Sequence, residues 1–229
     1  IFITGSNSYL LSGELATKLT GRYVEVEMFT LNFREYLEMK AFFGKEIKSD
    51  KTEEFNEYIR FGGFPKVLEF DSLEDKETYI SDVISQILDK DVVKHKKIRN
   101  RSVFDKLMTY VINNFGATMS ISGIAEYFKK QEHLIIKAET LNNYLQILEN
   151  AKIIYKCPRF DVKSKKSLRG EQKYYLADLG IYFSRNVDAR INYGPVLENI
   201  VYTYLSAKNY KISVGRVGKL ECDFITRVN

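Results

Sequence analysis

The 229-residue sequence contains no tryptophan, three prolines, two cysteines and two histidines. Cys157 and Cys222 lie far apart, and neither His95 nor His133 has a cysteine or histidine neighbour. A zinc site, a disulfide scaffold and Cys/His catalysis therefore have little support. No run of about 18 apolar residues is present to span a membrane, and the opening IFITGSNS lacks the basic region of a signal peptide. We expect a cytoplasmic protein without a membrane partner.

Net charge and chain length only loosely limit the possible partners and the number of domains. Lys and Arg number 35 and Asp and Glu number 30, giving a net charge of +5, which permits an anionic partner without requiring one. The length suits one large domain or two to three small ones. The chain opens directly on an apolar strand, whose edges would be unpaired outside a larger sheet. We interpret the sequence as a fragment of a longer chain at both ends.

The first 100 residues divide into a mixed part and a helical part. Residues 1–4 and 22–29 have the apolar or alternating pattern of strands, and NFREYLEMK follows as a helix. Residues 41–100 are mainly helical, with EEFNEYIRF broken by Gly62, Gly63 and Pro65. A basic segment, KHKKIRNR, leads into the next part.

Residues 101–177 show a sharper pattern. Amphipathic helices are predicted over 102–116, 119–131 and 137–151, the second capped by Ser120 or Ser122. Two apolar runs with a basic loop between them follow, over 152–177. Three helices and then a β-hairpin is the order of a winged helix-turn-helix. Residues 178–229 add a helix over 195–210 and two strands, 211–217 and 219–228.

Several stretches together resemble one family. They are IFITGSNSYLLSGELATKLTGRYVEV, LNFREYLE, IRFGGFP, LNNYLQILENAKIIYK, KYYLADLGI, LENIVYTYL and ECDFI. They are similar to bacterial and archaeal AAA-type ATPases with a C-terminal winged helix and a restriction-endonuclease-like domain of unknown function. The resemblance implies an α/β multidomain fold: the end of a P-loop ATPase core in 1–40, a helical lid in 41–100, a winged helix in 101–177 and part of a nuclease-like domain in 178–229.

ATP and Mg²⁺ are the cofactors that the resemblance implies. Phosphate binding needs the P-loop G-x-x-x-x-G-K-[ST], which does not occur here, because GKE and GKL lack its first glycine and its Ser or Thr. An acidic strand end to hold the magnesium is absent as well. We expect no ATP hydrolysis by this chain alone, and a homo-oligomer for the full-length protein.

Two residues match accessory positions of the ATPase site by resemblance. Asn7 is the candidate sensor of the terminal phosphate, ahead of Thr4 and Ser6; the alternative is a polar strand-to-helix turn. Arg22 lies between a helix and a strand, where such ATPases often place an arginine finger, worth about 10³–10⁵ in rate in other phosphoryl-transfer systems. The alternative is a surface arginine at a strand start.

The winged-helix pattern predicts a DNA contact. The outward side of the third helix offers Lys137, Asn142, Asn143 and Gln146, and amides can pair with adenine edges. Residues 152–173 hold eight basic and two acidic residues, a local balance of +6, and the predicted contacts there are Lys163, Lys165, Lys166 and Arg169. Glu139 opposes this, and winged helices also serve as protein-binding modules.

The C-terminal part suggests a Mg²⁺ site of the nuclease type. Glu198 lies on a helix, and Glu221 and Asp223 share a strand face if side chains alternate, with Cys222 and Phe224 facing the core. The expected acid-x-Lys strand would begin after Asn229, so we assign no catalytic lysine. The alternative is local pairing by Glu198 and an acidic protection of an edge strand.

Two functions therefore remain open. The first is part of an ATP-binding AAA-type ATPase that acts on or binds DNA. The second is a non-catalytic module that binds DNA or protein through a degenerate nuclease fold. The sequence does not identify the substrate or the number of subunits.

Overall fold

The computed structural model describes residues 24, 26–88, 98–164, 166–186, 190–218 and 220–227, without the side chains of 166–169. Asn7, Arg22 and Lys165, three predicted site residues, lie outside these ranges. The described chain is a mixed α/β structure of eight α-helices and one five-stranded sheet. None of its described helices has the length and apolar character needed to cross a bilayer.

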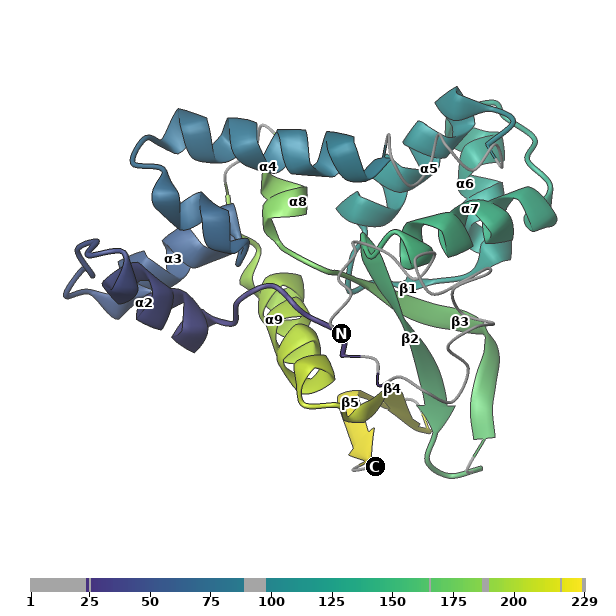
Figure 1. Ribbon diagram of the computed structural model, residues 1–229. Helices are drawn as coiled ribbons and strands as arrows, with labels where there is room; N and C mark the ends of the chain where they lie inside the picture. The colour runs from purple at the N-terminus through teal and green to yellow at the C-terminus, as the bar shows by residue number, and fades with distance from the viewer. Residues whose placement is uncertain are drawn as a thin grey trace.

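The first described helices form one end of the molecule (Figure 1). They are α2 (Phe33–Phe42), α3 (Lys51–Phe61), the 3-10 helix η2 (Pro65–Glu69) and α4 (Leu73–Ile87). Asn32 and Glu35 form a reciprocal capping box at the start of α2. Between α2 and α3, the buried Lys40 ammonium lies 2.8 Å from the Glu54 carboxylate, so two charged side chains are satisfied within the interior.

The next helices gather at the opposite end (Figure 1). They are α5 (Arg101–Asn113), α6 (Ile121–Gln131) and α7 (Ala138–Asn150), with the short strand β1 (Thr118–Met119) between the first two. The Ser120 hydroxyl accepts a hydrogen bond from the backbone N–H of Gly123, which confirms Ser120 as the cap of α6. The three predicted helices are confirmed within a few residues at each end.

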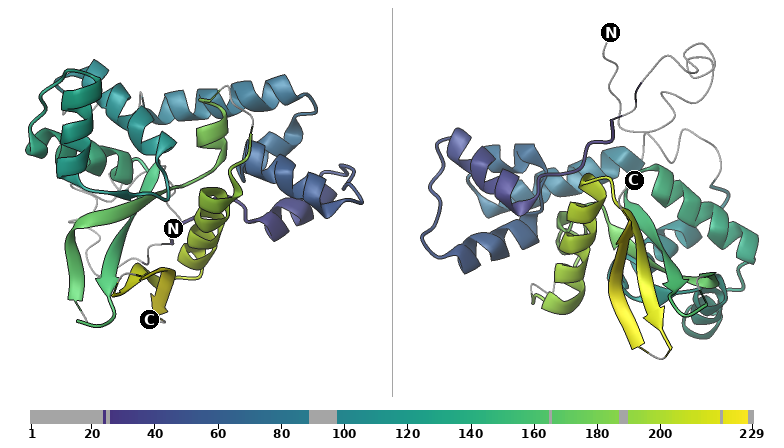
Figure 2. Two further views of the ribbon diagram at one scale, coloured as in Figure 1. Left: turned by 180° about the vertical axis from the view of Figure 1, so that it is seen from behind. Right: turned by 90° about the horizontal axis from the view of Figure 1, so that it is seen from below.

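The sheet joins the hairpin after α7 to the last segment of the chain. Its strands are β2 (Ile154–Asp161), β3 (Lys166–Leu176), β4 (Lys211–Val217) and β5 (Leu220–Arg227), in the order β1-β3-β2-β4-β5. All neighbours are antiparallel except β2 and β4, which pair in parallel from Arg159 to Asp161. The helices α8 (Gly180–Phe183) and α9 (Tyr193–Ala207) connect β3 to β4, and α9 packs beside β4 (Figure 2).

One hydrophobic core crosses three of the four predicted divisions of the chain. It includes Ile59 and Ile84 from the helical part, Phe104 and Leu145 from α5 and α7, and Val196 from α9. A smaller cluster under α9 contains Cys157, Tyr175, Tyr202 and Val214. The described parts are therefore packed as one body.

Candidate functional site

Helix α7 separates its apolar and polar sides as its sequence predicts. Its buried residues are Leu141, Tyr144, Leu145 and Leu148, at helical spacing. The predicted contact residues Lys137, Asn142, Asn143 and Gln146 are all exposed. Glu139 is exposed too, so this face carries one negative charge near its start. The structure thus brings four of the predicted contacts together on one open surface.

The amides on this surface differ in their partners. The Asn142 side chain donates to the backbone oxygen of Ala138 at 3.1 Å, and the Gln146 side chain donates to Asn150 at 3.1 Å. The Asn143 side chain makes no hydrogen bond to another described residue. Asn143 therefore has both its donor and its acceptor available on the outer face.

The hairpin carries less free positive charge than its sequence suggests. Lys163 is exposed in the turn between β2 and β3. However, Lys152 pairs with Glu27. Arg159 is buried against Glu171 and Glu221, and Lys173 is buried as well. Three of the eight basic residues counted in this region are thus held by carboxylates within the fold, and the predicted balance of +6 overstates the charge offered to a ligand.

Lys173 lies between two of the three predicted metal ligands. Its ammonium is 2.7 Å from a carboxylate oxygen of Glu198 on α9 and 2.7 Å from one of Glu221 on β5. The hydroxyl of Tyr175 donates to Glu198 at 2.5 Å. We call these residues, together with Arg159, the Lys173 cluster. Glu198 and Glu221 thus lie on either side of a lysine, which occupies the space between them.

The electrostatics of the Lys173 cluster favour the charged lysine. Burial acts to lower the pKa of Lys173, but the hydrogen bonds and charges of Glu198 and Glu221 outweigh it and raise that pKa above its usual value. The residue is only 5% exposed. A protonated Lys173 therefore neutralises much of the negative charge that would attract a metal ion.

Sequence reasoning missed Lys173 as a member of this site. The chain separates Lys173 from Glu221 by 48 positions, and two strands lie between β3 and β5 in the sheet. A local signal was present nevertheless, because Glu171-Gln172-Lys173 is an acid-x-Lys triplet on a strand. The prediction placed such a triplet after Asn229, whereas the structure has one before Glu198.

Asp223 does not join Glu198 and Glu221. The register of β4 against β5 shifts between Ser213 and Gly215, so Asp223 and Phe224 together oppose Val214. Phe224 packs near Tyr175, with ring centroids 5.7 Å apart. Asp223 is exposed and takes part in no ion pair among the described residues.

The same bulge overturns a prediction for Cys222. Strict alternation along the strand placed Cys222 beside Phe224 on the core side, but the structure leaves Cys222 exposed. The bulge adds one residue on β5, which interrupts the two-residue period on which the prediction depended. Within the described ranges, no group of three or more His, Cys, Asp or Glu side chains is placed to hold a metal ion.

A second buried carboxylate, that of Asp178, contacts glycines in two separate stretches of the chain. Asp178, after β3, accepts hydrogen bonds from the backbone N–H groups of Gly63 and Gly180, both at 2.8 Å. A side chain at Gly62 would collide with Asp178, because a Cβ there would lie 1.6 Å from its carboxylate oxygen. Burial raises the pKa of Asp178 to about 6, although the N–H donors act against this. This carboxyl ties α3 to α8.

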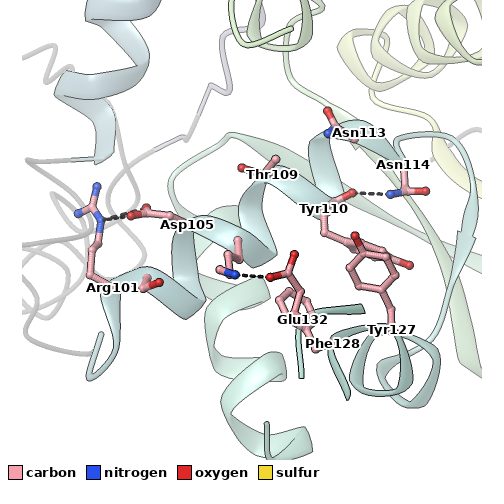
Figure 3. A pocket seen from close by; sticks show the side chains of 11 residues that line it. Arg101, Asp105, Thr109, Tyr110, Asn113, Asn114, Tyr127, Phe128 and Glu132 are labelled. Carbon is pink, nitrogen blue, oxygen red and sulfur yellow. Dashed lines mark hydrogen bonds and ion pairs between the residues drawn. The ribbon is translucent and has the colours of Figure 1, made fainter. Parts of the chain in front are cut away.

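A surface pocket of about 650 Å³ lies between α5 and α6 (Figure 3). Arg101 pairs with Asp105, and Lys106 pairs with Glu132. The rings of Tyr110 and Tyr127 form one wall, with centroids 4.4 Å apart. The pocket contains none of the predicted site residues, and its four charged side chains are paired with one another.

Family models match two segments of the chain. The model of a domain of unknown function, DUF8612, matches residues 52–189, which is 138 of the 229 residues. The chain belongs to the DUF8612 family. Its DUF8612 region runs through the predicted boundaries at residues 100 and 177, as does the hydrophobic core. An AAA domain model matches residues 1–37, which indicates an AAA-type segment before the DUF8612 region.

The chain is similar to three curated proteins that are named as uncharacterized. A protein of Haemophilus influenzae is 34% identical over 227 residues, covering 99% of this chain and 56% of the relative. MJ1544 of Methanocaldococcus jannaschii is 34% identical over 215 residues, covering 92% of this chain and 48% of the relative. MJ1637 of the same organism is 23% identical over 245 residues. The chain spans about half the length of these relatives.

Proposed function

We propose that the DUF8612 chain binds duplex DNA through residues 101–177, which act as a winged helix. The observation that carries this proposal is the order α5-β1-α6-α7-β2-β3, in which β1 pairs antiparallel with β3. In DNA-binding proteins with a helix-turn-helix, the second helix of the motif lies in the major groove. Here that helix is α7, whose outer side presents Lys137, Asn142, Asn143 and Gln146.

The phosphate contacts in this proposal come from the hairpin. Lys163 is exposed at its turn, and Lys165, Lys166 and Arg169 follow in sequence. Contacts to phosphates supply affinity that does not depend on sequence and that weakens as salt rises. Lys163 and Lys137 thus give the surface positive charge beside the amide face, which carries one negative charge at Glu139.

The AAA domain match supports an ATP-binding role for the longer protein. In that role Arg22 would act as an arginine finger and Asn7 as a sensor, with ATP and Mg²⁺ held mainly by residues that this sequence does not contain. By resemblance to AAA-type ATPases, such a finger would reach the nucleotide of a neighbouring subunit, and in that role the protein would be a homo-oligomer. ATP hydrolysis by the full-length protein should rise with its concentration, and Arg22→Ala should lower it.

A gel-shift titration at low salt tests the DNA-binding proposal. The variant with Lys163, Lys165, Lys166 and Arg169 all changed to Glu should lose duplex binding. For the single change Lys163→Glu, the matched control is Lys51→Glu, because Lys51 is exposed at the start of α3. Helix α3 lies at the other end of the molecule from the β2–β3 hairpin (Figure 1). Lys163→Glu should weaken binding and reduce the salt slope by about 0.9 for each phosphate that it no longer neutralises, and Lys51→Glu should change neither.

Two outcomes would contradict this function. Unchanged binding by the quadruple variant would remove the hairpin from the interface. No duplex binding by the wild-type chain at low salt would favour the alternative, a module that binds protein and does not touch DNA.

Metal-dependent cleavage is a second candidate, favoured by the convergence of Glu198 and Glu221 at Lys173. Carboxylates can hold Mg²⁺ for phosphodiester hydrolysis, and here Mg²⁺ would have to displace the Lys173 ammonium from between the two carboxylates. Plasmid nicking that requires Mg²⁺ and is abolished in Glu198→Gln would support it. Nicking that survives Glu198→Gln would assign the activity to another site or to a contaminant.

A further inference from the structure

The reading side of α7 has an unusual composition for a DNA-binding helix. Residues 138–150 contain no lysine and no arginine, although these are the side chains that pair with guanine in the commonest specific contact. The exposed side chains near the middle of the helix are the amides Asn142, Asn143 and Gln146. If α7 enters the major groove, its middle is therefore equipped to contact adenine rather than guanine.

Among the described residues, Asn143 alone of these three amides makes no side-chain hydrogen bond. Asn142 donates to Ala138 and Gln146 donates to Asn150, so each would give up an internal hydrogen bond to reach a base. Asn143 would break no hydrogen bond to another described residue when it contacts a base. Its oxygen can accept from the N6 amino group of adenine while its nitrogen donates to N7, which is the bidentate pair for this base.

We infer that Asn143 is the specificity-determining residue of α7, and that the DNA bound by this chain carries an adenine at the position facing Asn143. This inference rests on the proposed function and extends it from duplex DNA in general to sites that contain a defined A·T pair. Exposed Lys137 and Lys163 contribute affinity for any sequence. Asn143 adds the preference among sequences.

The experiment begins with selection from a randomised duplex library by the wild-type chain. Binding constants are then measured by fluorescence anisotropy for the enriched duplex and for one in which the shared A·T pair is changed to G·C. The wild type should prefer the enriched duplex by about 5- to 150-fold, the range of one good bidentate contact. Asn143→Ala should lose this preference while keeping the weaker affinity for the G·C duplex and the same salt slope.

Asn192→Ala is the control, because it removes an exposed amide at the N-cap of α9, outside residues 101–177, where the side chain makes no capping hydrogen bond. It should keep the preference for the A·T duplex. A chemical control acts on the DNA: 7-deazaadenine at the shared position removes the N7 acceptor. It should weaken binding by the wild type and leave Asn143→Ala unaffected.

Different failures have different meanings. Absence of any duplex binding by the wild type overturns both the proposed function and this inference. Binding without a shared adenine in the enriched sites overturns the inference alone. Full preference for the A·T duplex in Asn143→Ala, at unchanged thermal stability, assigns the adenine contact to another residue and also overturns it.

Discussion

At the scale of single residues, the stability of the Lys173 cluster depends on the ammonium group that pairs with Glu198 and Glu221. Lys173→Met keeps most of the apolar stem but leaves Glu198 and Glu221 facing each other without the ammonium between them. Removing one partner of a buried ion pair costs about 3–5 kcal/mol, and the cost here should lie near or below 3 because Glu221 stays 34% exposed. Urea denaturation should show this loss of stability.

A second substitution separates this effect from simple loss of packing. Adding Glu198→Gln to Lys173→Met removes one of the two unpaired carboxylates and should restore part of the lost free energy of unfolding. If the double variant is less stable than Lys173→Met, the carboxylates do not repel each other and the ion-pair description of the cluster is wrong.

Asp178 predicts a dependence of stability on pH. Its pKa is raised by burial to about 6, from an ordinary value of 3.8, so the folded state binds the proton more tightly than the unfolded state. The resulting stabilisation is complete below the unfolded pKa and is lost as the pH rises through about 6. Relative to Asp178→Asn, the wild type should gain about 1.4 kcal/mol between pH 7 and pH 5.

Thermal or urea unfolding of both proteins at the two pH values measures this gain. The comparison with Asp178→Asn cancels the carboxylates that the two proteins share. A difference that stays constant would mean that the N–H groups of Gly63 and Gly180 keep Asp178 ionised at pH 5.

At the scale of elements, the sequence predicted the helices better than the strands. The apolar residues of α7 repeat at the helical period along the whole element, so its buried face and its exposed amides follow from the sequence. The strand pattern of β5 was correct until the bulge opposite Val214, which depends on pairing with β4. Lys173 was not predicted as part of the site, because the order of the strands in the sheet places it next to Glu221. No local sequence pattern contains that order.

The reactivities of the two cysteines test whether the bulge on β5 exposes Cys222. Cys157 is fully buried, and burial raises the pKa of its thiol to about 12, so almost no reactive thiolate is present at neutral pH. Cys222 is exposed. A thiol reagent should therefore modify one cysteine quickly in the native protein and the second only in urea, and Cys222→Ser should abolish the fast reaction. Protection of both thiols in the native protein would instead indicate that Cys222 faces the core, as strict alternation along β5 predicts.

At the scale of the whole molecule, the DUF8612 region and the last strands share their interior. The core joins α3 and α4 to α5, α7 and α9, while the parallel pair β2–β4 makes the hairpin and the C-terminal strands one sheet. The family resemblance divides the chain into four groups of segments, and grouping along the chain does not determine which apolar faces meet. Packing across those groups predicts cooperative unfolding.

Urea unfolding should accordingly show one transition. Far-UV circular dichroism follows the helices at both ends of the molecule, and tyrosine fluorescence is readable because the chain has 16 tyrosines and no tryptophan. The two signals should coincide, as expected for an all-or-none transition. Asp178→Asn, which weakens the tie between α3 and α8, should move both curves together. Separate midpoints, with fluorescence and circular dichroism diverging in this variant, would instead show that residues 101–177 fold independently of the helices before them.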